Sequence, residues 1–227
     1  MGRTLLSVKN LTKTYGKGSS AFTALHGVDL EIQAGEVLAV IGKSGSGKST
    51  LMHLLALLDS PTEGSVSVDG QNARGLKRSN VDDIRNREFG FVFQQFFLNA
   101  SDTVLTTVVL PLKIAGVGAR ARKRRGLELL KAVELEDKAA AKAGNLSGGQ
   151  KQRVVIARAL INNPRVIFAD EPTGNLDSAT GRKIENLLFK LNKDQGITLI
   201  FVTHDPDLAK RCQRQVHIKD GKVEKIV

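Results

Sequence analysis

The sequence predicts an α/β fold with a mostly parallel sheet, an antiparallel β-subdomain at the N-terminus and an inserted α-helical subdomain. Over much of the chain, wholly apolar runs alternate with helical patterns, which is typical of a parallel sheet with helices on its faces. Residues 5–11 and 28–32 instead alternate apolar and polar positions, as half-buried antiparallel strands do. From residue 96 to about 145, helical periodicity dominates. We therefore expect one domain with a core of 1–95 and 146–227 and a helical subdomain at about 96–145.

The expected elements follow in order along the chain. In the N-terminal part we predict strands over 5–11, 21–25 and 28–32. Later predicted strands cover 37–41, 65–69, 89–93, 165–169, 197–202, 215–219 and 222–226, the last two forming a hairpin. Predicted helices cover 79–88, 104–114, 120–135 and 178–190. Another helix follows Lys48, with Leu58 on its apolar face, and another follows Gln150.

Composition limits the classes of protein to which the chain can belong. With 227 residues, 41% of them hydrophobic, it can bury a core of its own. It has no apolar stretch near the ~20 residues that span a bilayer, and its first residues lack the apolar core of a signal peptide. The single cysteine, Cys212, cannot form a disulfide within the chain, which favours a reducing, cytoplasmic setting.

The formal net charge of +11 favours an anionic partner, such as a nucleotide, a nucleic acid or a membrane surface. Part of this charge lies in a basic run from Arg120 to Arg125. The run has two interpretations: a helix face solvated by water, or a surface that contacts anionic lipid. Aromatic residues make up only 4% of the chain and none lies within the run, so the charge alone does not predict single-stranded nucleic-acid binding.

A glycine-rich loop follows the predicted strand 37–41 and has the pattern G-x-x-x-x-G-K-S. Its residues are Gly42, Lys43, Ser44, Gly45, Ser46, Gly47, Lys48 and Ser49, and Thr50 follows in the helix. Such a loop wraps a polyphosphate with backbone N–H groups and a helix N-terminus. Lys48 supplies charge to the β and γ phosphates and Ser49 a hydroxyl to Mg²⁺. A turn could match by chance, but the flanking strand and helix are the context that a P-loop NTPase core requires.

Polar side chains stand at the ends of three further predicted strands. Asp170 and Glu171 end one strand, where a carboxylate can bind Mg²⁺ through water and a second can orient a water against the γ phosphate. The alternative is that the two acidic residues simply follow the strand, as acidic residues often do, and have no role in binding. His204 ends another strand and suits a donor to the γ phosphate, although a lone histidine is more often structural. Gln94, at a third strand exit, can contact Mg²⁺ or the attacking water.

Ser147, Gly148 and Gly149 precede a helix and form a second potential anion site, with serine as the N-cap. One nucleotide has one triphosphate, and the glycine-rich loop already wraps it. The second site therefore binds something else or reaches a nucleotide bound by another copy of the chain. This is a physical indication of a dimer.

Taken together, these motifs resemble those of the ATP-binding subunits of ABC transporters. The resemblance rests on the glycine-rich loop, Gln94, Leu146-Ser147-Gly148-Gly149-Gln150, Val166 to Glu171, Gly174 to Asp177 and His204, in that order. It covers essentially the whole chain. The segments Phe91 to Phe96, Leu110 to Leu112 and Glu171 to Asp177 resemble the subgroup that serves lipoprotein release, macrolide and peptide efflux, and cell division.

The resemblance implies ATP and Mg²⁺ as cofactors and a head-to-tail dimer. Each ATP would lie between the Lys48 loop of one chain and Ser147, Gly148, Gly149 and Gln150 of the other. Tyr15 would stack on adenine, Glu171 would act as catalytic base and His204 would contact the γ phosphate. Asp177 would cross the dimer interface, and Gln94 would connect Mg²⁺ to the helical subdomain, where a membrane permease docks.

Two departures from the family pattern concern the nucleotide and the partner. Lys43 stands where proline is common, and Asn99 to Asp102 replaces a proline-containing segment that faces the membrane subunit. The expected function is ATP hydrolysis that drives a separate permease at the cytoplasmic face of the membrane. The alternative is an ATPase that regulates cell division or cell-wall enzymes through a membrane partner without transport.

Overall fold

The computed structural model describes residues 2–227, which form two compact units. The first unit contains the chain up to Arg85 and again from Gly196 onward, and the second is Asn86–Gln195. Helix α2 (Arg78–Glu88) crosses the boundary between them. The predicted division into a core and a helical subdomain at about 96–145 remains a prediction.

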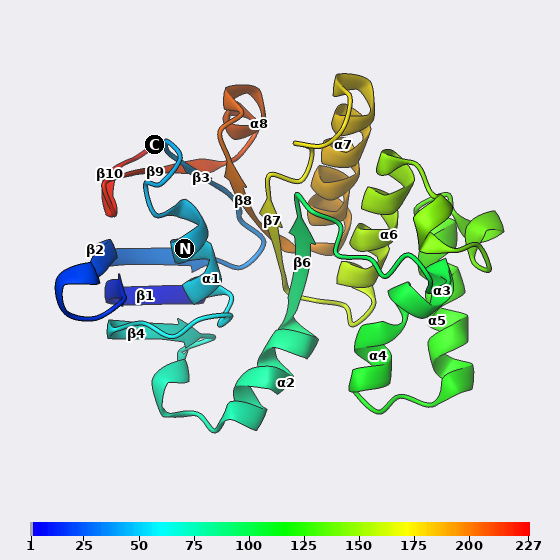
Figure 1. Cartoon of the computed structure of the whole chain (residues 1–227), viewed down its shortest axis with the longest axis horizontal. Coiled ribbons are helices and arrows are strands. Elements are labelled where there is room, and N and C mark those ends of the chain that lie inside the picture. Colours follow the sequence, from blue (N-terminus) through cyan, green and yellow to red (C-terminus); the bar gives the residue numbers. More distant parts are fainter. Residues whose placement is uncertain (1) are drawn as a thin grey trace. The chain divides into compact units, whose positions relative to one another are not determined.

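The first unit begins with an antiparallel sheet, as predicted (Figure 1). Its strands, in spatial order, are β2 (Phe22–Gln33), β1 (Thr4–Tyr15), β4 (Glu63–Val68) and β5 (Gln71–Asn72). The prediction of separate strands over 21–25 and 28–32 is wrong, because both form the single strand β2. Their apparent separation comes from a bulge, since the register with β1 shifts near Gly27, whose φ is 67°.

The other strands of the first unit form the mostly parallel part that the sequence predicts. They are β10 (Lys222–Ile226), β9 (Arg214–Lys219), β3 (Val37–Ile41) and β8 (Thr198–Thr203), in that spatial order. Strand β3 is parallel to both β8 and β9, while β10 and β9 form the predicted antiparallel hairpin. All six residues of β8 are buried, as a strand covered on both faces should be. A short helix, α8 (Pro206–Lys210), follows β8.

Helix α1 (Lys48–Leu55) buries Leu51, Leu54 and Leu55 but ends before Leu58. The prediction that Leu58 belongs to its apolar face is therefore wrong, and Leu58 is 41% exposed. The helix ends because Leu57 is left-handed, with a φ of 55°. The N–H groups of Leu58 and Leu57 donate to the carbonyls of His53 and Leu54, which is the hydrogen-bond pattern of a Schellman motif.

The second unit contains the parallel pair β6 (Phe89–Phe93) and β7 (Val166–Asp170) (Figure 1). Phe168 is fully buried and contacts the rings of Phe89 and Phe91, with centroids at 5.3 and 5.7 Å. Helix α6 (Gly148–Leu160) packs closely on β6, because a Cβ at Gly90 would lie 2.7 Å from the carbonyl oxygen of Ala159. These strands and α6 form the core of this unit.

The remaining helices of the second unit differ in length from the predictions. They are α3 (Val104–Val108), α4 (Leu110–Ile114), α5 (Ala119–Ala132) and α7 (Ser178–Gln195). The single helix predicted over 104–114 is wrong, since Val109 separates α3 from α4. Pro111 accounts for the break, because it has no N–H to donate to a carbonyl one turn earlier. Short 3-10 turns, Gly18–Ser20, Ala73–Gly75, Glu136–Lys138 and Ala143–Asn145, complete the two units.

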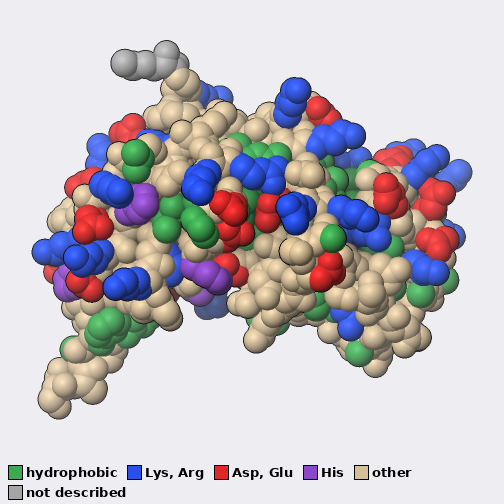
Figure 2. Space-filling model, turned by 90° about the horizontal axis from the view of Figure 1, so that it is seen from above, with side chains coloured by type: hydrophobic (Ala, Val, Ile, Leu, Met, Phe, Trp, Pro, Cys, Tyr) green, Lys and Arg blue, Asp and Glu red, His purple; other side chains and the backbone are tan. Residues whose placement is uncertain are grey.

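The net charge of +11 is not concentrated in one patch on the face shown in Figure 2. Lysine and arginine side chains are spread over this face and are interspersed with acidic side chains. Within residues 2–227, no helix combines the length and the apolar character needed to cross a membrane.

Candidate functional site

The glycine-rich loop connects β3 to α1 in the first unit and leaves the start of α1 open to an anion. Gly47 is the N-cap of α1, and it supplies no side-chain hydrogen bond to the first-turn N–H groups. Its φ of 104° and a Cβ position only 2.6 Å from the carbonyl oxygen of Ala24 both require glycine. Lys48 Nζ donates to the carbonyl oxygens of Gly42 and Lys43 at 2.8 and 2.9 Å. The loop therefore combines an ammonium group with a helix N-terminus, which suits a polyphosphate.

The β9–β10 hairpin fixes the back of this loop. The N–H of Gly221, in the hairpin turn, donates to the carbonyl oxygen of Ser46 at 3.0 Å. The carbonyl oxygen of Gly221 accepts from the N–H of His26 at 2.9 Å. A cavity of about 500 Å³ lies between the loop and the hairpin and includes Lys43, Ser44 and Gly45 in its lining. The hairpin thus links the phosphate-binding loop to β2.

His204 follows β8 at the same edge of the first unit. Strands β3 and β8 are parallel with Ile41 opposite Thr203, so Gly42 and His204 leave neighbouring strands at the same level. The structure therefore brings His204 beside the start of the glycine-rich loop, as a contact with the γ phosphate requires. The next residue, Asp205, caps α8 by accepting from the N–H groups of Asp207 and Leu208.

Tyr15 lies at the end of β1, in the same unit, and its side chain is 40% exposed. Its hydroxyl donates to Asp59 Oδ2 at 3.0 Å, and Lys13 Nζ lies 4.8 Å from its ring centroid. Burial and the hydrogen bond to Asp59 raise the pKa of Tyr15. Burial opposes ionisation of Asp59, but hydrogen bonds from Lys13, Ser60 and Tyr15 keep the pKa of this carboxyl below its usual value. Tyr15 is thus an ordered aromatic ring with an accessible surface.

In the second unit, Gln94 and Asp170-Glu171 leave adjacent strands together. Phe93 pairs with Asp170 in the register of β6 and β7, so the next residues, Gln94 and Glu171, follow at the same level. Asn175 Nδ2 donates to the carbonyl oxygen of Gln94 at 2.8 Å. Glu171 has a φ of 45°, a conformation that non-glycine residues rarely adopt and that occurs preferentially at functional sites.

The start of α6 carries the capping arrangement that the sequence predicts. The Ser147 hydroxyl accepts from the N–H of Gln150 at 3.3 Å, and Gln150 Oε1 accepts from the N–H of Ser147 at 2.9 Å. This reciprocal capping box leaves the N–H groups of Gly148 and Gly149 for another acceptor. A cavity of about 800 Å³ in this unit is lined by Ser147 to Gln150 and by Asp177. The structure therefore brings these predicted residues to one cavity.

Asp177 also caps α7, as the sequence predicts. Its Oδ1 accepts from the N–H groups of Ala179 and Thr180 at 3.1 and 3.0 Å. Hydrogen bonds from the side chain and the N–H of Thr180 lower the pKa of the Asp177 carboxyl.

Sequence reasoning missed two polar residues of α6 that fix the loops of the second unit. Gln152 is fully buried, and its Nε2 donates to the carbonyl oxygen of Pro172 at 2.7 Å, directly after Glu171. Arg158 donates to the carbonyl oxygens of Phe97 and Phe96 at 3.1 and 3.3 Å, close to Gln94, and burial lowers its pKa. A glutamine and an arginine among the buried positions of an amphipathic helix are the signal that could have indicated these contacts.

The oxygen donors present suit Mg²⁺ better than a metal that needs nitrogen or sulfur ligands. Ser49 in the first unit offers a hydroxyl, and Gln94 and Asp170 in the second unit offer an amide oxygen and a carboxylate; each is a hard ligand. In the described part of the chain, no group of three or more His, Cys, Asp or Glu side chains is arranged to bind a metal by itself. Mg²⁺ that uses one or two protein oxygens together with phosphate and water fits such a donor set.

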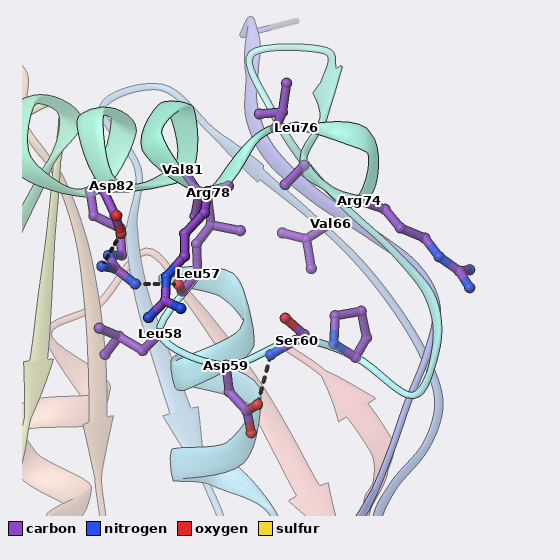
Figure 3. A pocket seen from close by; sticks show the side chains of 13 residues that line it. Leu57, Leu58, Asp59, Ser60, Val66, Arg74, Leu76, Arg78, Val81 and Asp82 are labelled. Carbon is purple, nitrogen blue, oxygen red and sulfur yellow. Dashed lines mark hydrogen bonds and ion pairs between the residues drawn. The ribbon is translucent and has the colours of Figure 1, made fainter.

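Another cavity of the first unit, of about 610 Å³, contains none of the predicted site residues (Figure 3). Its apolar lining includes Leu58, Val66 and Val81. Asp59 and Ser60 lie at its edge, and Figure 3 shows the hydrogen bond, of 2.7 Å, from the Ser60 N–H to Asp59 Oδ1. The cavity thus adjoins the carboxylate that binds Tyr15.

Comparison with known proteins identifies the family from which these motifs come. Residues 25–174 match the family model described as ABC transporter. The chain belongs to the ABC transporter family. The resemblance inferred from the motifs is confirmed, and the chain is an ATP-binding subunit of this family with its ABC ATPase fold.

Relatives and solved structures within the ABC family extend over almost the whole chain. The chain is 48% identical to the uncharacterised ABC transporter ATP-binding protein MJ0796 of Methanocaldococcus jannaschii, over 97% of this chain and 96% of the relative. It is also 48% identical to the lipoprotein-releasing system ATP-binding protein LolD of Syntrophotalea carbinolica, over 98% of each chain. The predicted subgroup is therefore confirmed.

Two solved ABC structures have the same fold. A dimer of MJ0796 in a post-hydrolysis state with ADP and Pi has a TM-score of 0.90 and 46% identity, over 98% of each chain. CbiO1 of Clostridium perfringens, part of the ABC transporter complex CbiONQ, has a TM-score of 0.86 and 30% identity. This match covers 99% of the present chain and 88% of CbiO1.

The cap at Asp177 predicts a specific dependence of stability on pH. The pKa of this carboxyl is lower in the folded than in the unfolded chain, so the ionised form stabilises the folded state at neutral pH. This contribution is lost as the pH falls below the ordinary value of 3.8 toward the folded-state pKa. Asp177→Asn keeps a capping oxygen but cannot titrate. Urea unfolding at pH 7 and at successively lower pH should give a shallower pH dependence for Asp177→Asn, and identical slopes would contradict the assignment.

Proposed function

We propose that two copies of the chain bind ATP head to tail and hydrolyse it to drive a membrane permease. The observation that carries this proposal is the presence of two helix N-termini of different kinds. The start of α1 is uncapped and has Lys48 beside it, whereas the start of α6 is capped by its own Ser147 and Gln150. A single triphosphate is bound by the start of α1. The second, with the N–H groups of Gly148 and Gly149, suits a nucleotide bound by the other copy.

The proposed roles follow the chemistry of each side chain. Lys48 and the first-turn N–H groups of α1 bind the phosphates, and Ser44, Ser46 and Thr50 belong to the same loop and helix start. Ser49, Gln94 and, through water, Asp170 hold Mg²⁺, which neutralises phosphate charge when it is bound.

Two further residues act on the γ phosphate in this proposal. Glu171, fixed in a left-handed conformation, accepts a proton from the attacking water as general base. His204 donates a hydrogen bond to the γ phosphate from the edge where Gly42 begins the loop. Tyr15 stacks on adenine, and Asp177 faces the other copy.

The membrane partner is proposed from the relatives. LolD is named as part of a lipoprotein-releasing system, and CbiO1 is part of a transporter complex. We place this chain likewise at the cytoplasmic face of the membrane, attached through a permease that handles lipoproteins, peptides or drugs. We expect the permease to dock on Gln94, which follows β6, and on the helices after it.

Replacing the proposed general base should nearly abolish hydrolysis. Loss of a general base lowers a rate by about 10²- to 10⁴-fold, so purified Glu171→Gln should release phosphate from ATP and Mg²⁺ at a correspondingly lower rate. Glu136→Gln, an exposed carboxylate in the 3-10 turn Glu136–Lys138, is the matched control. Equal phosphate release by wild type and Glu171→Gln would show that Glu171 is not the base.

The same variant should trap the dimer, because unhydrolysed ATP continues to join the two copies. Light scattering of Glu171→Gln with ATP and Mg²⁺ should give twice the mass found without nucleotide. Adding Ser147→Ala, which removes the hydroxyl at the start of α6, should shift this mass back toward the monomer. A mass that stays monomeric with saturating ATP at high protein concentration would exclude the head-to-tail arrangement.

We further propose that the outward face of α5 contacts anionic lipid. Arg122 donates to the carbonyl oxygen of Val117 and Arg125 to Asn163, so both are engaged within the protein. Arg120, Lys123 and Arg124 are exposed on the other side of the helix, and Ile114, at the end of α4, is 69% exposed. Exposed basic side chains are typical of a contact with an anionic membrane surface, and an exposed apolar side chain adds to such a contact.

This proposal predicts salt-sensitive binding to vesicles. Wild type should co-sediment with vesicles that contain phosphatidylserine at low salt, and less as salt screens the charges. Changing Arg120, Lys123 and Arg124 to Glu should abolish the binding. The same change at Arg182, Lys190 and Lys193, which are exposed on α7, is the control. No binding of wild type at low salt, or equal loss in the control, would contradict the lipid contact.

A further inference from the structure

Lys13, Asp59 and Ser60 form a small network that fixes the ring of Tyr15. Lys13 Nζ lies 4.8 Å from the ring centroid and donates to Asp59 Oδ1 and to the carbonyl oxygen of Ser60, both at 2.7 Å. The Tyr15 hydroxyl donates to the other oxygen of Asp59 at 3.0 Å. One carboxylate thus orients both the ring and the ammonium group that lies over it.

We propose that Lys13 and Asp59 are positioning residues that present the ring of Tyr15 to the base of the nucleotide. This inference rests on the proposed function, in which Tyr15 stacks on adenine. The ammonium group of Lys13 covers one face of the ring, so a base stacks on the opposite face. The network thereby determines both the orientation of the ring and the face on which the base binds.

The burial of Lys13 explains why the network is rigid. Its side chain is only 12% exposed, whereas that of Asp59 is 32% exposed. A lysine that is largely removed from water and makes two short hydrogen bonds has lost its rotamer freedom. Asp59 is fixed as well, because it also accepts from the Ser60 N–H at 2.7 Å. The hydrogen bonds from Lys13, Ser60 and Tyr15 keep the pKa of Asp59 below its usual value, so they favour its ionised form.

The network is also connected directly to the phosphate-binding loop through α1. The N–H of Asp59 donates to the carbonyl oxygen of His53, in the last turn of α1, at 3.3 Å. The first residue of the same helix is Lys48. One helix of eight residues therefore separates the support of the aromatic ring from the phosphate-binding lysine. This arrangement fixes the ring of Tyr15 relative to Lys48 through α1.

The composition of the chain allows the environment of Tyr15 to be measured directly. The chain has one tyrosine and no tryptophan, so its intrinsic fluorescence and its absorbance near 295 nm report on Tyr15 alone. Stacking of adenine on the ring should quench that fluorescence. Inorganic tripolyphosphate has no base to stack, so it should bind without this quenching, and calorimetry gives its affinity for comparison with that of ATP.

The experiment compares Lys13→Met, Lys13→Arg and Asp59→Asn with wild type, using Lys9→Met, an exposed lysine on the same strand, as control. Lys13→Met and Asp59→Asn should weaken ATP binding by about two- to fivefold, the range of an exposed cation–π contact. Tripolyphosphate affinity should stay unchanged. Lys13→Arg should bind ATP as tightly as wild type, because a guanidinium group can also cover the face of an aromatic ring. In Asp59→Asn, absorbance titration should show the pKa of Tyr15 closer to its ordinary value.

Calorimetry of Tyr15→Ala distinguishes the proposed contact of Tyr15 with adenine from the positioning role of Lys13 and Asp59. Loss of base stacking should weaken ATP binding by about fivefold to 150-fold and leave tripolyphosphate unaffected. If Tyr15→Ala binds ATP normally, the proposed contact of Tyr15 with adenine fails. If Tyr15→Ala weakens ATP binding but Lys13→Met and Asp59→Asn do not, the positioning role is overturned. Equal weakening of tripolyphosphate and ATP in those two variants would indicate general structural damage and would likewise overturn it.

Discussion

The start of α1, which has no side-chain cap, is the constraint around which the first unit is arranged. The uncapped N–H groups behind Gly47 are donors that the helix itself cannot satisfy. The surrounding elements keep those donors in place: β3 ends directly before the loop, and Gly221 of the β9–β10 turn binds the Ser46 carbonyl. Lys48, which binds carbonyls of its own loop, adds the positive charge. The first unit is thus arranged so that unsatisfied donors and one ammonium group converge.

The second unit positions its polar groups in a different way, through side chains of one helix. Helix α6 presents a capped N-terminus at Ser147 and, further along, binds the two functional loops of its unit. Gln152 binds the carbonyl of Pro172 beside Glu171, and Arg158 binds the carbonyls that follow the Gln94 exit. A displacement at the start of α6 would therefore reach both loops through hydrogen bonds. Helix α6 is therefore connected by hydrogen bonds both to the loop after Glu171 and to the segment after Gln94.

Local patterns predicted the caps and the hairpin turn better than they predicted where strands and helices begin and end. The G-x-x-x-x-G-K-S loop, the capping residues Ser147 and Asp177, and the hairpin at Asp220-Gly221 were found because each depends on a few neighbouring residues. The errors arose where the backbone departs from a regular pattern. The bulge at Gly27 made the single strand β2 look like two strands in the sequence. The left-handed Leu57 ended α1 early, and Pro111 divided a predicted helix.

By itself, the sequence determined which residues cap helices and which elements alternate, because these depend on residue type and short spacing, and it predicted the groups that would bind phosphate. Tertiary structure decided the contacts between residues far apart in the chain. Asp59 meets Lys13 and Tyr15, Gly221 meets Ser46, and Gln152 meets Pro172 only after strands and helices have packed. No local period encodes such contacts, since each depends on how side chains and carbonyls from separate elements satisfy one another once the elements have packed.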